Sequence, residues 1–315
     1  MKNLFKVQFS ILLIFLVASC QEQNRKKSVE LTDENSVLVE HPLGETRVPK
    51  NPDRVVVMEY GSLDTMKELG LDEKVVGIPK NNLPAYLNAY EEDETIKNTG
   101  GLKDLNFQTI NELQPDLIII GNRQVDDYEE LSKIAPTIFM IVDYADYTDS
   151  FKENARYLGD IFGKEELLEK KLKNIDKVSK EIQEFTKKDD KEALIVMYNE
   201  RKFSAYGKGS RFGIVHDVFG IEPASKNLEV AVHGKSISNE YIYDTNPDYL
   251  FIIDRGAAIN TNKANRKEVE NALIQKTNAF KEDKIVYLSP DIWYLSGGGL
   301  MSFQRMAEEI KSALY

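Results

Sequence analysis

Apolar runs and amphipathic segments alternate along most of the chain. Four runs are unbroken in the way that is typical of strands buried on both faces: "RVVVMEY" at 54–60, "LIIIGN" at 117–122, "EALIVMYNE" at 192–200 and "NPDYLFIID" at 246–254. Between the runs, apolar residues recur at helical spacing, as in "SLDTMKELG", which ends in a glycine typical of a helix terminus. Alternating strands and helices predict parallel sheets covered by helices, and therefore an α/β fold.

One longer amphipathic segment divides this pattern. Residues 164–188, "KEELLEKKLKNIDKVSKEIQEFTKK", keep apolar residues three and four positions apart and predict a single long α-helix. We therefore expect an N-terminal lobe at 37–163 and a C-terminal lobe at 189–315. Each is expected to be Rossmann-like with a central parallel sheet, and the ligand cleft is expected between the two lobes.

The two predicted lobes share a short internal similarity. "QPDLIIIGNR" and "NPDYLFIIDR" each place a Pro-Asp turn before a buried strand and an arginine after it. Pro115 precedes Arg123 by eight residues, and Pro247 precedes Arg255 by eight. A Pro-Asp turn before a strand is common in α/β folds, so the match supports two related lobes only together with the helix that separates them.

The first residues are typical of an export signal. Lys2 and Lys6 precede the apolar run "ILLIFLVA", which is too short to span a bilayer, so residues 1–19 are predicted to be a cleaved signal peptide. The segment "LVASC" resembles a bacterial lipobox and predicts lipidation of Cys20, the only cysteine of the chain. Residues 20–36 are polar and lack periodicity, which predicts a flexible tether. We expect an exported protein that its lipid holds at the cell membrane.

The charge balance narrows the class of partner. Acidic residues outnumber basic ones by 52 to 41, and the formal net charge is −11. A negative protein repels a polyanion, which argues against nucleic acid as a partner. After the signal peptide no apolar run reaches the length of a membrane span.

Three arginines follow the ends of predicted buried strands. Arg123 follows "LIIIGN", Arg201 follows "EALIVMYNE" and Arg255 follows "LFIID". Ligands of open α/β sheets bind at the carboxyl ends of the strands, so the three guanidinium groups are expected to converge on one anionic ligand. For a single arginine a surface ion pair is the simpler interpretation, and Glu200 and Asp254 are adjacent candidates. Three arginines at equivalent strand ends favour the anion site.

Two loops contain possible metal ligands. His233 lies in "VAVHGKSIS" and Tyr294 in "DIWYLSGGG", whereas His41 and His216 fall in a predicted hairpin and a predicted helix and are interpreted as structural. A hard cation such as ferric iron favours oxygen ligands, including phenolate, and accepts imidazole. One histidine and one tyrosine are too few to hold a metal alone. We therefore expect no intrinsic cofactor, and any iron must arrive already complexed.

These motifs together resemble a known family over nearly the whole mature chain. "HPLGETRVPKNPDRVVVMEYGSLDTMKELGL" is similar to the N-terminal signature of periplasmic-type binding proteins of the helical-backbone class, which serve ABC importers of iron–siderophore complexes. "NELQPDLIIIGNR" and "NPDYLFIIDRG" resemble the paired helix–strand segments of that class. Within the class, the likeness is greatest to the subfamily that binds catecholate siderophores such as petrobactin.

The resemblance implies roles for the candidate residues. Arg123, Arg201 and Arg255 match the three cleft arginines of the subfamily. His233 and Tyr294 match a pair that can complete the coordination of iron when the siderophore leaves two positions open. The resemblance therefore implies a ferric siderophore, bound as a complex, as the ligand.

The implied ligand is an anionic ferric catecholate, whose charge the arginines would offset. Trp293 and Tyr60 are expected to pack against catechol rings. One helix joins the lobes in this class, so the opening motion is expected to be small. The N-terminal signature alone would leave another iron chelate, haem or cobalamin open as the ligand.

The resemblance also implies a protein partner. In this family an acidic residue on the outer tip of each lobe docks on the ABC permease. Counting back from the helix-ending glycines places Asp64 and Asp217 at those positions, with Glu68 or Glu59 as alternatives on the first lobe. We expect the binding protein itself to be a monomer.

An enzyme, for example an envelope hydrolase, is the alternative from another class. "GKGSRFG" at 207–213 has the glycines of a phosphate loop but lacks the spacing of the known fingerprints, and it is interpreted as an ordinary loop. Neither GxSxG nor HExxH occurs. A cell-surface adhesion module would fit the lipid anchor but would leave the strand-end arginines unexplained. We therefore expect a binding protein without catalytic activity.

Overall fold

The structure, a computed structural model, describes residues 31–315 except 229, 232, 260 and 262. The predicted signal peptide, Cys20 and the first part of the predicted tether lie outside the described residues. Residues 31–315 cluster as one unit. Within the part of the chain that is described, no helix is both long and apolar enough to cross a bilayer.

The first sheet has five parallel strands built mostly from short apolar runs. They are β3 (Val55–Val57), β4 (Val75–Ile78), β5 (Lys97–Asn98), β6 (Leu117–Ile120) and β7 (Thr137–Phe139). Their order is β5-β4-β3-β6-β7, and every residue of β3 and β6 is buried. Because the order of the strands reverses between β3 and β6, a crevice is expected at the carboxyl ends of these two strands.

An antiparallel hairpin precedes this sheet. It consists of β1 (Ser36–His41) and β2 (Gly44–Pro49). His41 packs edge-on against Tyr128, with ring centres 5.6 Å apart, and its Nε2 lies 3.0 Å from the hydroxyl of Thr46. His41, which was interpreted as structural from the sequence, is therefore a packing residue.

The second sheet is mixed, whereas the sequence predicted a parallel one. Its strands are β8 (Glu192–Asn199), β9 (Lys202–Tyr206), β10 (Glu222–Pro223), β11 (Lys235–Ile237), β12 (Tyr249–Asp254) and β13 (Ile285–Leu288). β8 is parallel to β10 and β12, and β12 is parallel to β13, but β9 is antiparallel to β8 and β11. Glu200 and Arg201 join β8 to β9 with φ angles of 49° and 66°. Two left-handed residues in succession are what a two-residue hairpin requires, so a hairpin and not a helix follows β8.

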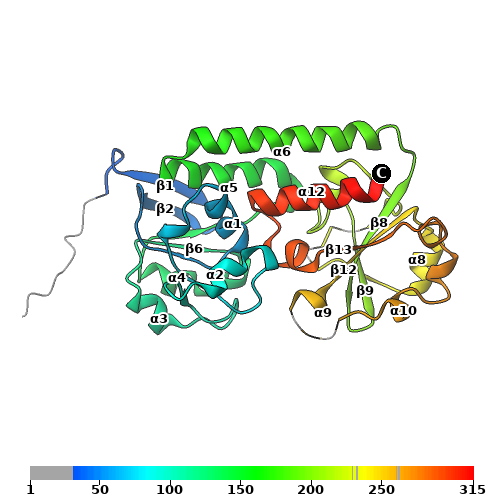
Figure 1. The fold of residues 1–315 in the computed structure, drawn as a ribbon, viewed down its shortest axis with the longest axis horizontal. Helices are drawn as coiled ribbons and strands as arrows, with labels where there is room; N and C mark the ends of the chain where they lie inside the picture. The colour runs from blue at the N-terminus through cyan, green and yellow to red at the C-terminus, as the bar shows by residue number, and fades with distance from the viewer. Residues whose placement is uncertain (1–30, 229, 232, 260, 262) are drawn as a thin grey trace, which may run out of the picture. The chain divides into compact units, whose positions relative to one another are not determined.

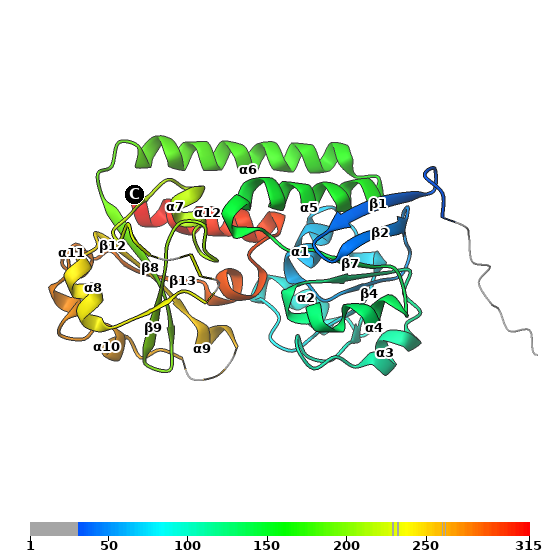
Figure 2. The same cartoon turned by 180° about the vertical axis from the view of Figure 1, so that it is seen from behind.

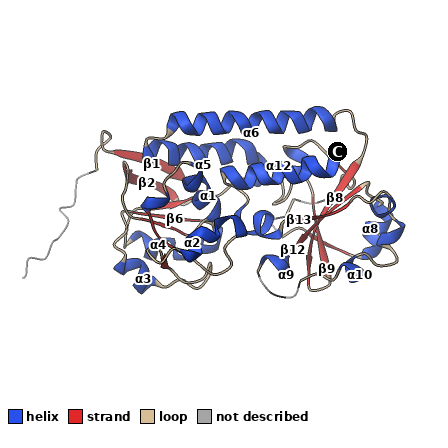
Figure 3. Ribbon diagram, in the orientation of Figure 1, coloured by secondary structure: helices blue, strands red, loops and turns tan. Residues whose placement is uncertain are grey.

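Three long helices lie along the two sheets. They are α5 (Tyr147–Phe162), α6 (Glu165–Thr186) and α12 (Leu300–Leu314), and α6 packs against both of the others (Figures 1 and 2). The remaining helices are shorter: α1 (Tyr60–Glu68), α2 (Asn88–Glu92), α3 (Phe107–Glu112), α4 (Tyr128–Ser132), α7 (Ile214–Asp217), α8 (Asn239–Thr245), α9 (Arg255–Ala258), α10 (Arg266–Val269) and α11 (Asn278–Lys281). Figure 3 shows the strands of both sheets (red) beneath the long helices (blue). The predicted α/β fold with two lobes and one long connecting helix is confirmed.

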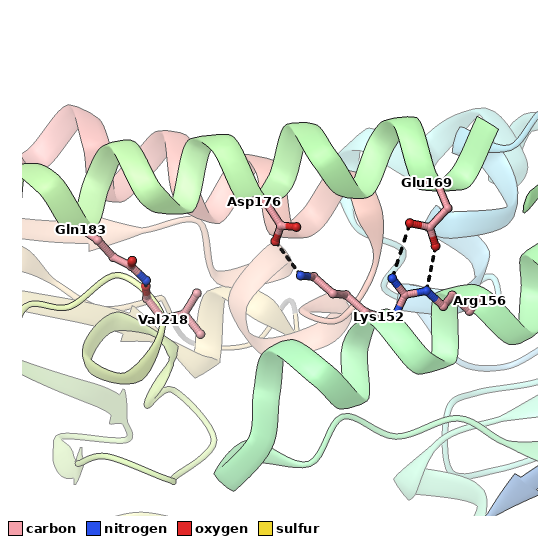
Figure 4. A network of polar contacts seen from close by, with 6 residues as sticks. All are labelled: Lys152, Arg156, Glu169, Asp176, Gln183 and Val218. Carbon is pink, nitrogen blue, oxygen red and sulfur yellow. Dashed lines mark hydrogen bonds and ion pairs between the residues drawn. The ribbon is translucent and has the colours of Figure 1, made fainter. Parts of the chain in front are cut away.

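Helix α6 follows the amphipathic pattern from which residues 164–188 were predicted to be helical. Its buried positions include Leu168, Leu172, Ile175 and Ile182, which recur on one face of the helix. Polar contacts join the helix to both lobes (Figure 4): Asp176 to Lys152 at 2.6 Å, Glu169 to Arg156 at 2.7 Å, and Gln183 to the carbonyl of Val218 at 2.7 Å.

The last helix, α12, belongs to the core of both lobes. Phe303 on this helix stacks on Phe151 of α5 at 5.3 Å between ring centres and meets Phe219, which follows α7, edge-on at 5.9 Å. One hydrophobic cluster includes all three rings. The residues at 300–314 were expected within the C-terminal lobe, but this helix packs against α1 of the first lobe as well as α6. The two lobes therefore share one core along these helices.

Candidate functional site

A pocket of about 90 Å³ lies at the crevice between the two lobes. It combines the carboxyl ends of β3 and β6 with the loop before α7 and a π-helix, Ile292–Ser296, that leads toward α12. Its polar lining residues include Glu59, Arg123, Tyr147, Arg211, Trp293 and Tyr294. The reversal of strand order between β3 and β6 thus marks one wall of the pocket.

Tyr294 is the centre of a cluster of three arginines. Arg123 and Arg211 both donate hydrogen bonds from Nη2 to the backbone carbonyl of Tyr294, at 3.0 and 2.6 Å. Arg255 donates from Nε to the phenol oxygen of Tyr294 at 3.0 Å and from Nη1 to Asn199 at 3.1 Å. The three guanidinium carbons lie 5.8, 4.4 and 5.7 Å from the centre of the tyrosine ring, in the order Arg123, Arg211, Arg255. All four side chains are half-buried.

The charges of this cluster change the acidity of the phenol. Burial raises the pKa of Tyr294, but the hydrogen bond from Arg255 and the charges of the three arginines outweigh burial, so the pKa lies below its usual value. Burial, and then repulsion by Arg211, lower the pKa of Arg123. An arginine remains protonated in proteins, so the cluster around Tyr294 carries three positive charges at neutral pH.

No carboxylate lies within ion-pair distance of these three arginines in the described part of the chain. Their hydrogen bonds run to uncharged oxygens of Tyr294 and Asn199. Each guanidinium has five N–H donors, and those not used here are available to a ligand. The arrangement is suited to a planar or multidentate anion.

Arg201 is not part of the cluster. Its side chain is 77% exposed and forms two hydrogen bonds with Glu268, at 2.8 and 3.2 Å. It occupies the tight turn between β8 and β9, so it lies at the tip of a hairpin instead of the opening of a strand–helix unit. The surface ion pair that was the simpler interpretation for a single arginine describes Arg201.

Arg211 is the third arginine of the cluster, and it was not predicted from the sequence. It belongs to the loop at 207–213 that was interpreted as an ordinary loop. Hydrogen bonds hold this loop in shape: the amide of Gly209 donates to Asp217 at 2.6 Å, and the hydroxyl of Ser210 donates to the carbonyl of Gly207 at 2.6 Å. A side chain on Gly213 would lie 2.8 Å from the carboxylate of Asp217, so glycine is needed there. The folded loop directs Arg211 to Tyr294.

His233 and Tyr294 are not brought together. The side chain of His233 is exposed and does not line the pocket, and its backbone carbonyl accepts a hydrogen bond from the hydroxyl of Tyr206 at 3.0 Å. Tyr294, in contrast, lines the pocket. In the described residues, Tyr294 is therefore the one of the two predicted ligands that faces this pocket.

The two aromatic residues predicted to pack against a ligand differ in position. Trp293 lines the pocket but is only 3% exposed, and its indole nitrogen donates to Glu309 at 2.8 Å. Tyr60 is 1% exposed, does not line the pocket, and donates its hydroxyl to the carbonyl of Pro79 at 2.9 Å. The expectation for Tyr60 is wrong, because the first turn of α1 faces the hydrophobic core.

Asp64 was expected at the outer tip of the first lobe, but it is completely buried. Its Oδ1 accepts from the amide of Met301 at 2.7 Å, and its Oδ2 accepts from the amide of Ser302 at 2.7 Å and from the hydroxyl of Tyr86 at 3.1 Å. Those amides belong to the first turn of α12, so Asp64 caps that helix. Asp64 as a permease contact is therefore wrong. Counting from a glycine does not identify which face of α1 is exposed, and residues Tyr60–Met66 are all buried.

The other three residues considered as permease contacts differ in their exposure and in their partners. Asp217 is exposed at the end of α7, although its Oδ2 accepts the hydrogen bond from Gly209. Glu68 pairs with Lys171 of α6 at 2.6 Å. Glu59 faces the pocket, not the outer surface.

Glu59 has a position that the sequence alone did not indicate. It follows β3 and begins α1, where its carboxylate accepts from the amides of Gly61 and Ser62 at 2.9 and 2.6 Å. A side chain at Gly121, at the end of β6, would lie 2.7 Å from Cγ of Glu59. Glycine at 121 therefore leaves the space that Glu59 fills. Burial raises the pKa of Glu59, whereas its hydrogen bonds and the charge of Arg123 lower it, and the net shift is upward.

Comparisons with known proteins extend over both lobes. A family model described as periplasmic binding protein matches residues 55–292. The petrobactin-binding protein YclQ of Bacillus subtilis (strain 168) is 44% identical over 314 residues, with 98% of this chain and 99% of that protein covered. The ferric-anguibactin-binding protein FatB of Vibrio anguillarum is 31% identical over 316 residues, with 98% of each chain covered.

Two solved structures are similar in fold as well as in sequence. The crystal structure of YclQ matches with a TM-score of 0.87 at 47% identity and covers 89% of this chain and 98% of its own. The crystal structure of the periplasmic catecholate-siderophore binding protein VctP of Vibrio cholerae matches with a TM-score of 0.82 at 34% identity, covering 88% and 99%.

Proposed function

Because the chain belongs to the periplasmic binding protein family, we propose that it is the substrate-binding lipoprotein of an ABC importer, which captures a ferric siderophore and delivers it to the membrane permease. The ligand is an anionic complex of the catecholate type. Ferric iron is cargo in this proposal: it arrives and leaves within the siderophore, and the protein needs no cofactor of its own. The protein binds and releases its ligand without a chemical step.

The observation that carries the proposal is the set of three guanidinium groups around Tyr294. Burying a charge without a counter-ion is costly, so a cluster of three half-buried arginines is suited to a ligand that brings negative charge. Each new charge-assisted hydrogen bond contributes about 1.5–3 kcal/mol. The names of YclQ and VctP, which specify petrobactin and a catecholate siderophore, support the choice of ligand class.

Tyr294 is proposed to offer its phenolate to the iron when the siderophore leaves a coordination position open. The surrounding arginines favour the deprotonated form of the phenol, and phenolate oxygen is a ligand that ferric iron accepts. A matching role for His233 requires the loop around it to move the imidazole toward the pocket, since the side chain is exposed.

The remaining parts of the proposal concern the cell envelope. The lipobox-like segment "LVASC" supports export and anchoring to the cell membrane through Cys20. Asp217, which is exposed, is the remaining candidate of the two predicted aspartates for docking on the permease. The protein is proposed to act as a monomer.

The proposal is tested by titrating the purified protein with an anionic ferric catecholate, a neutral ferric hydroxamate, haem and cobalamin. Trp293 is the only tryptophan and lines the pocket, so quenching of its fluorescence reports binding there. The ferric catecholate should bind more tightly than the other three. Tighter binding of the hydroxamate, haem or cobalamin would overturn the choice of ligand class.

A further inference from the structure

A second polar patch lines the same pocket and is not used by the arginine cluster. It consists of Glu59, at the start of α1, and Tyr147, at the start of α5. Both belong to the first lobe, whereas Tyr294 and Arg211 come from the second half of the chain. We call this pair of residues the Glu59–Tyr147 patch.

The carboxylate of Glu59 has unused capacity to accept hydrogen bonds. Oε1 accepts one bond, from the amide of Gly61, and Oε2 accepts two, from the amide and the hydroxyl of Ser62. A carboxylate offers about four acceptor positions, so one position on Oε1 is left. No ion pair joins Glu59 to Arg123 within the described residues, because the guanidinium of Arg123 is directed to the carbonyl of Tyr294.

The hydroxyl of Tyr147 is buried and has no hydrogen-bond partner in the described part of the chain. The residue is only 5% exposed, yet it lines the pocket. Burial raises the pKa of Tyr147, and the nearby charges of Tyr144 and Glu59 raise it further, so the side chain is a neutral hydroxyl. A buried polar group without a partner is unfavourable and is normally satisfied by water or by a ligand.

The size of the pocket limits what this patch can receive. Pockets that hold a whole small-molecule ligand usually measure about 300–1,000 Å³, and this one measures about 90 Å³. Only a small group of a larger ligand fits inside it, so the iron centre must lie at its opening, beside the arginines. A group that satisfies both Glu59 and Tyr147 must donate at least two hydrogen bonds, and a positive charge suits the carboxylate best.

We propose that the Glu59–Tyr147 patch is a subsite for a protonated amine carried by the siderophore. This inference rests on the proposed function and extends it to the chemistry of the ligand. The amine donates one N–H to Oε1 of Glu59 and another to the hydroxyl oxygen of Tyr147, while the anionic iron centre lies against the arginines. The protein therefore selects a ligand that carries both an anionic iron centre and a cationic backbone.

The test uses two bis-catecholamide chelators with linkers of equal length, one containing a secondary amine and the other a methylene group at the same place. Their ferric complexes are titrated at pH 7 by quenching of tryptophan fluorescence. The wild-type protein should bind the complex with the amine about tenfold more tightly, which corresponds to one charge-assisted hydrogen bond. Glu59→Gln should reduce this preference to less than about threefold, and Tyr147→Phe should reduce it as well.

Tyr147→Phe also separates a binding role from a structural one. Because the hydroxyl has no partner, its removal should leave the urea midpoint of the empty protein unchanged or higher. Glu129→Gln and Tyr243→Phe, which change an exposed glutamate and an exposed tyrosine outside the pocket, are the matched controls and should keep the tenfold preference.

Two results separate this inference from the proposed function. Equal affinity of the wild-type protein for both complexes would overturn the amine subsite while leaving siderophore binding intact. A tenfold preference that persists in both Glu59→Gln and Tyr147→Phe would also overturn it. Failure of the wild-type protein to bind either complex would overturn the proposed function, and the inference with it.

Discussion

Replacing Asp64 with asparagine should change how the stability of the protein depends on pH. The carboxylate is buried and links α1 to the amides of Met301 and Ser302 in the first turn of α12. Burial raises its pKa to about 6, against an ordinary value of 3.8, although the hydrogen bonds from these amides and from Tyr86 lower it. The folded protein therefore binds this proton more tightly than the unfolded chain.

The sign and size of the effect follow from that difference. The stabilising contribution of a group whose pKa is raised by folding is fully present below the pKa of the unfolded chain, and it is lost as the pH rises through the folded pKa. For values of 3.8 and about 6, the loss between pH 5 and pH 7.5 is about 1.4 kcal/mol. Asparagine does not titrate, so this contribution disappears in Asp64→Asn.

Urea unfolding of both proteins at several pH values between 5 and 7.5 measures the effect. The free energy of unfolding of the wild type minus that of Asp64→Asn should fall by about 1.4 kcal/mol over this range. A constant loss, caused by a poorer cap on α12, cancels in this comparison. Glu129→Gln removes an exposed carboxylate and controls for the loss of one surface charge. Parallel curves for the wild type and Asp64→Asn would refute the reasoning.

Four further predictions test the site and its surroundings. Arg211→Ala should weaken binding of an anionic ferric catecholate at least tenfold. Arg201→Ala should change the affinity less than about twofold, because an exposed ion pair contributes little. The reverse ranking would contradict the assignment of Arg211, and not Arg201, to the arginine cluster. Tyr294→Phe should remove the phenolate contribution to the visible absorption of a tetradentate ferric complex and leave a hexadentate one unaffected; an unchanged spectrum would exclude Tyr294 as an iron ligand. Cys20→Ser should release the protein from the membrane fraction without loss of affinity, and retention there would require another attachment. Asp217→Lys should stop import while Asp217→Asn slows it less, and a loss of siderophore affinity in Asp217→Lys would indicate a role in shaping the loop at 207–213 instead of docking.

The fold was predictable wherever local pattern determines structure. The Val and Ile runs became β3, β6 and β12, and the amphipathic pattern at 164–188 became α6 at Glu165–Thr186. The hairpin after β8 was missed because its turn residues, Glu200 and Arg201, are not the asparagine and glycine that signal such turns. The position of α12 was missed because Phe303 and its partners are far apart in the sequence.

The same limit explains which site residues were found. Arg123 and Arg255 follow buried parallel strands, a position that the sequence reveals, and the structure places both at Tyr294. Arg211 lies in the loop that follows β9, a strand that was not predicted from the sequence, and only the folded loop directs it to Tyr294. Asp64 was misplaced because its partners, the amides of α12, lie 237 and 238 residues further along the chain.

The hydrogen bonds within the arginine cluster also determine how the site responds to a ligand. The carbonyl of Tyr294 joins Arg123 of the first lobe to Arg211 of the second, so it links the two walls of the pocket. Each of these arginines uses one N–H group for that bond, and within the described residues most of its other N–H groups are available to an anion. The ligand therefore adds hydrogen bonds to a positioned set of donors and orders few side chains, which lowers the entropic cost of binding. The contacts of α6 and α12 with both lobes also lower the cost of binding, because they restrict the rearrangement of the lobes that a ligand would otherwise have to drive.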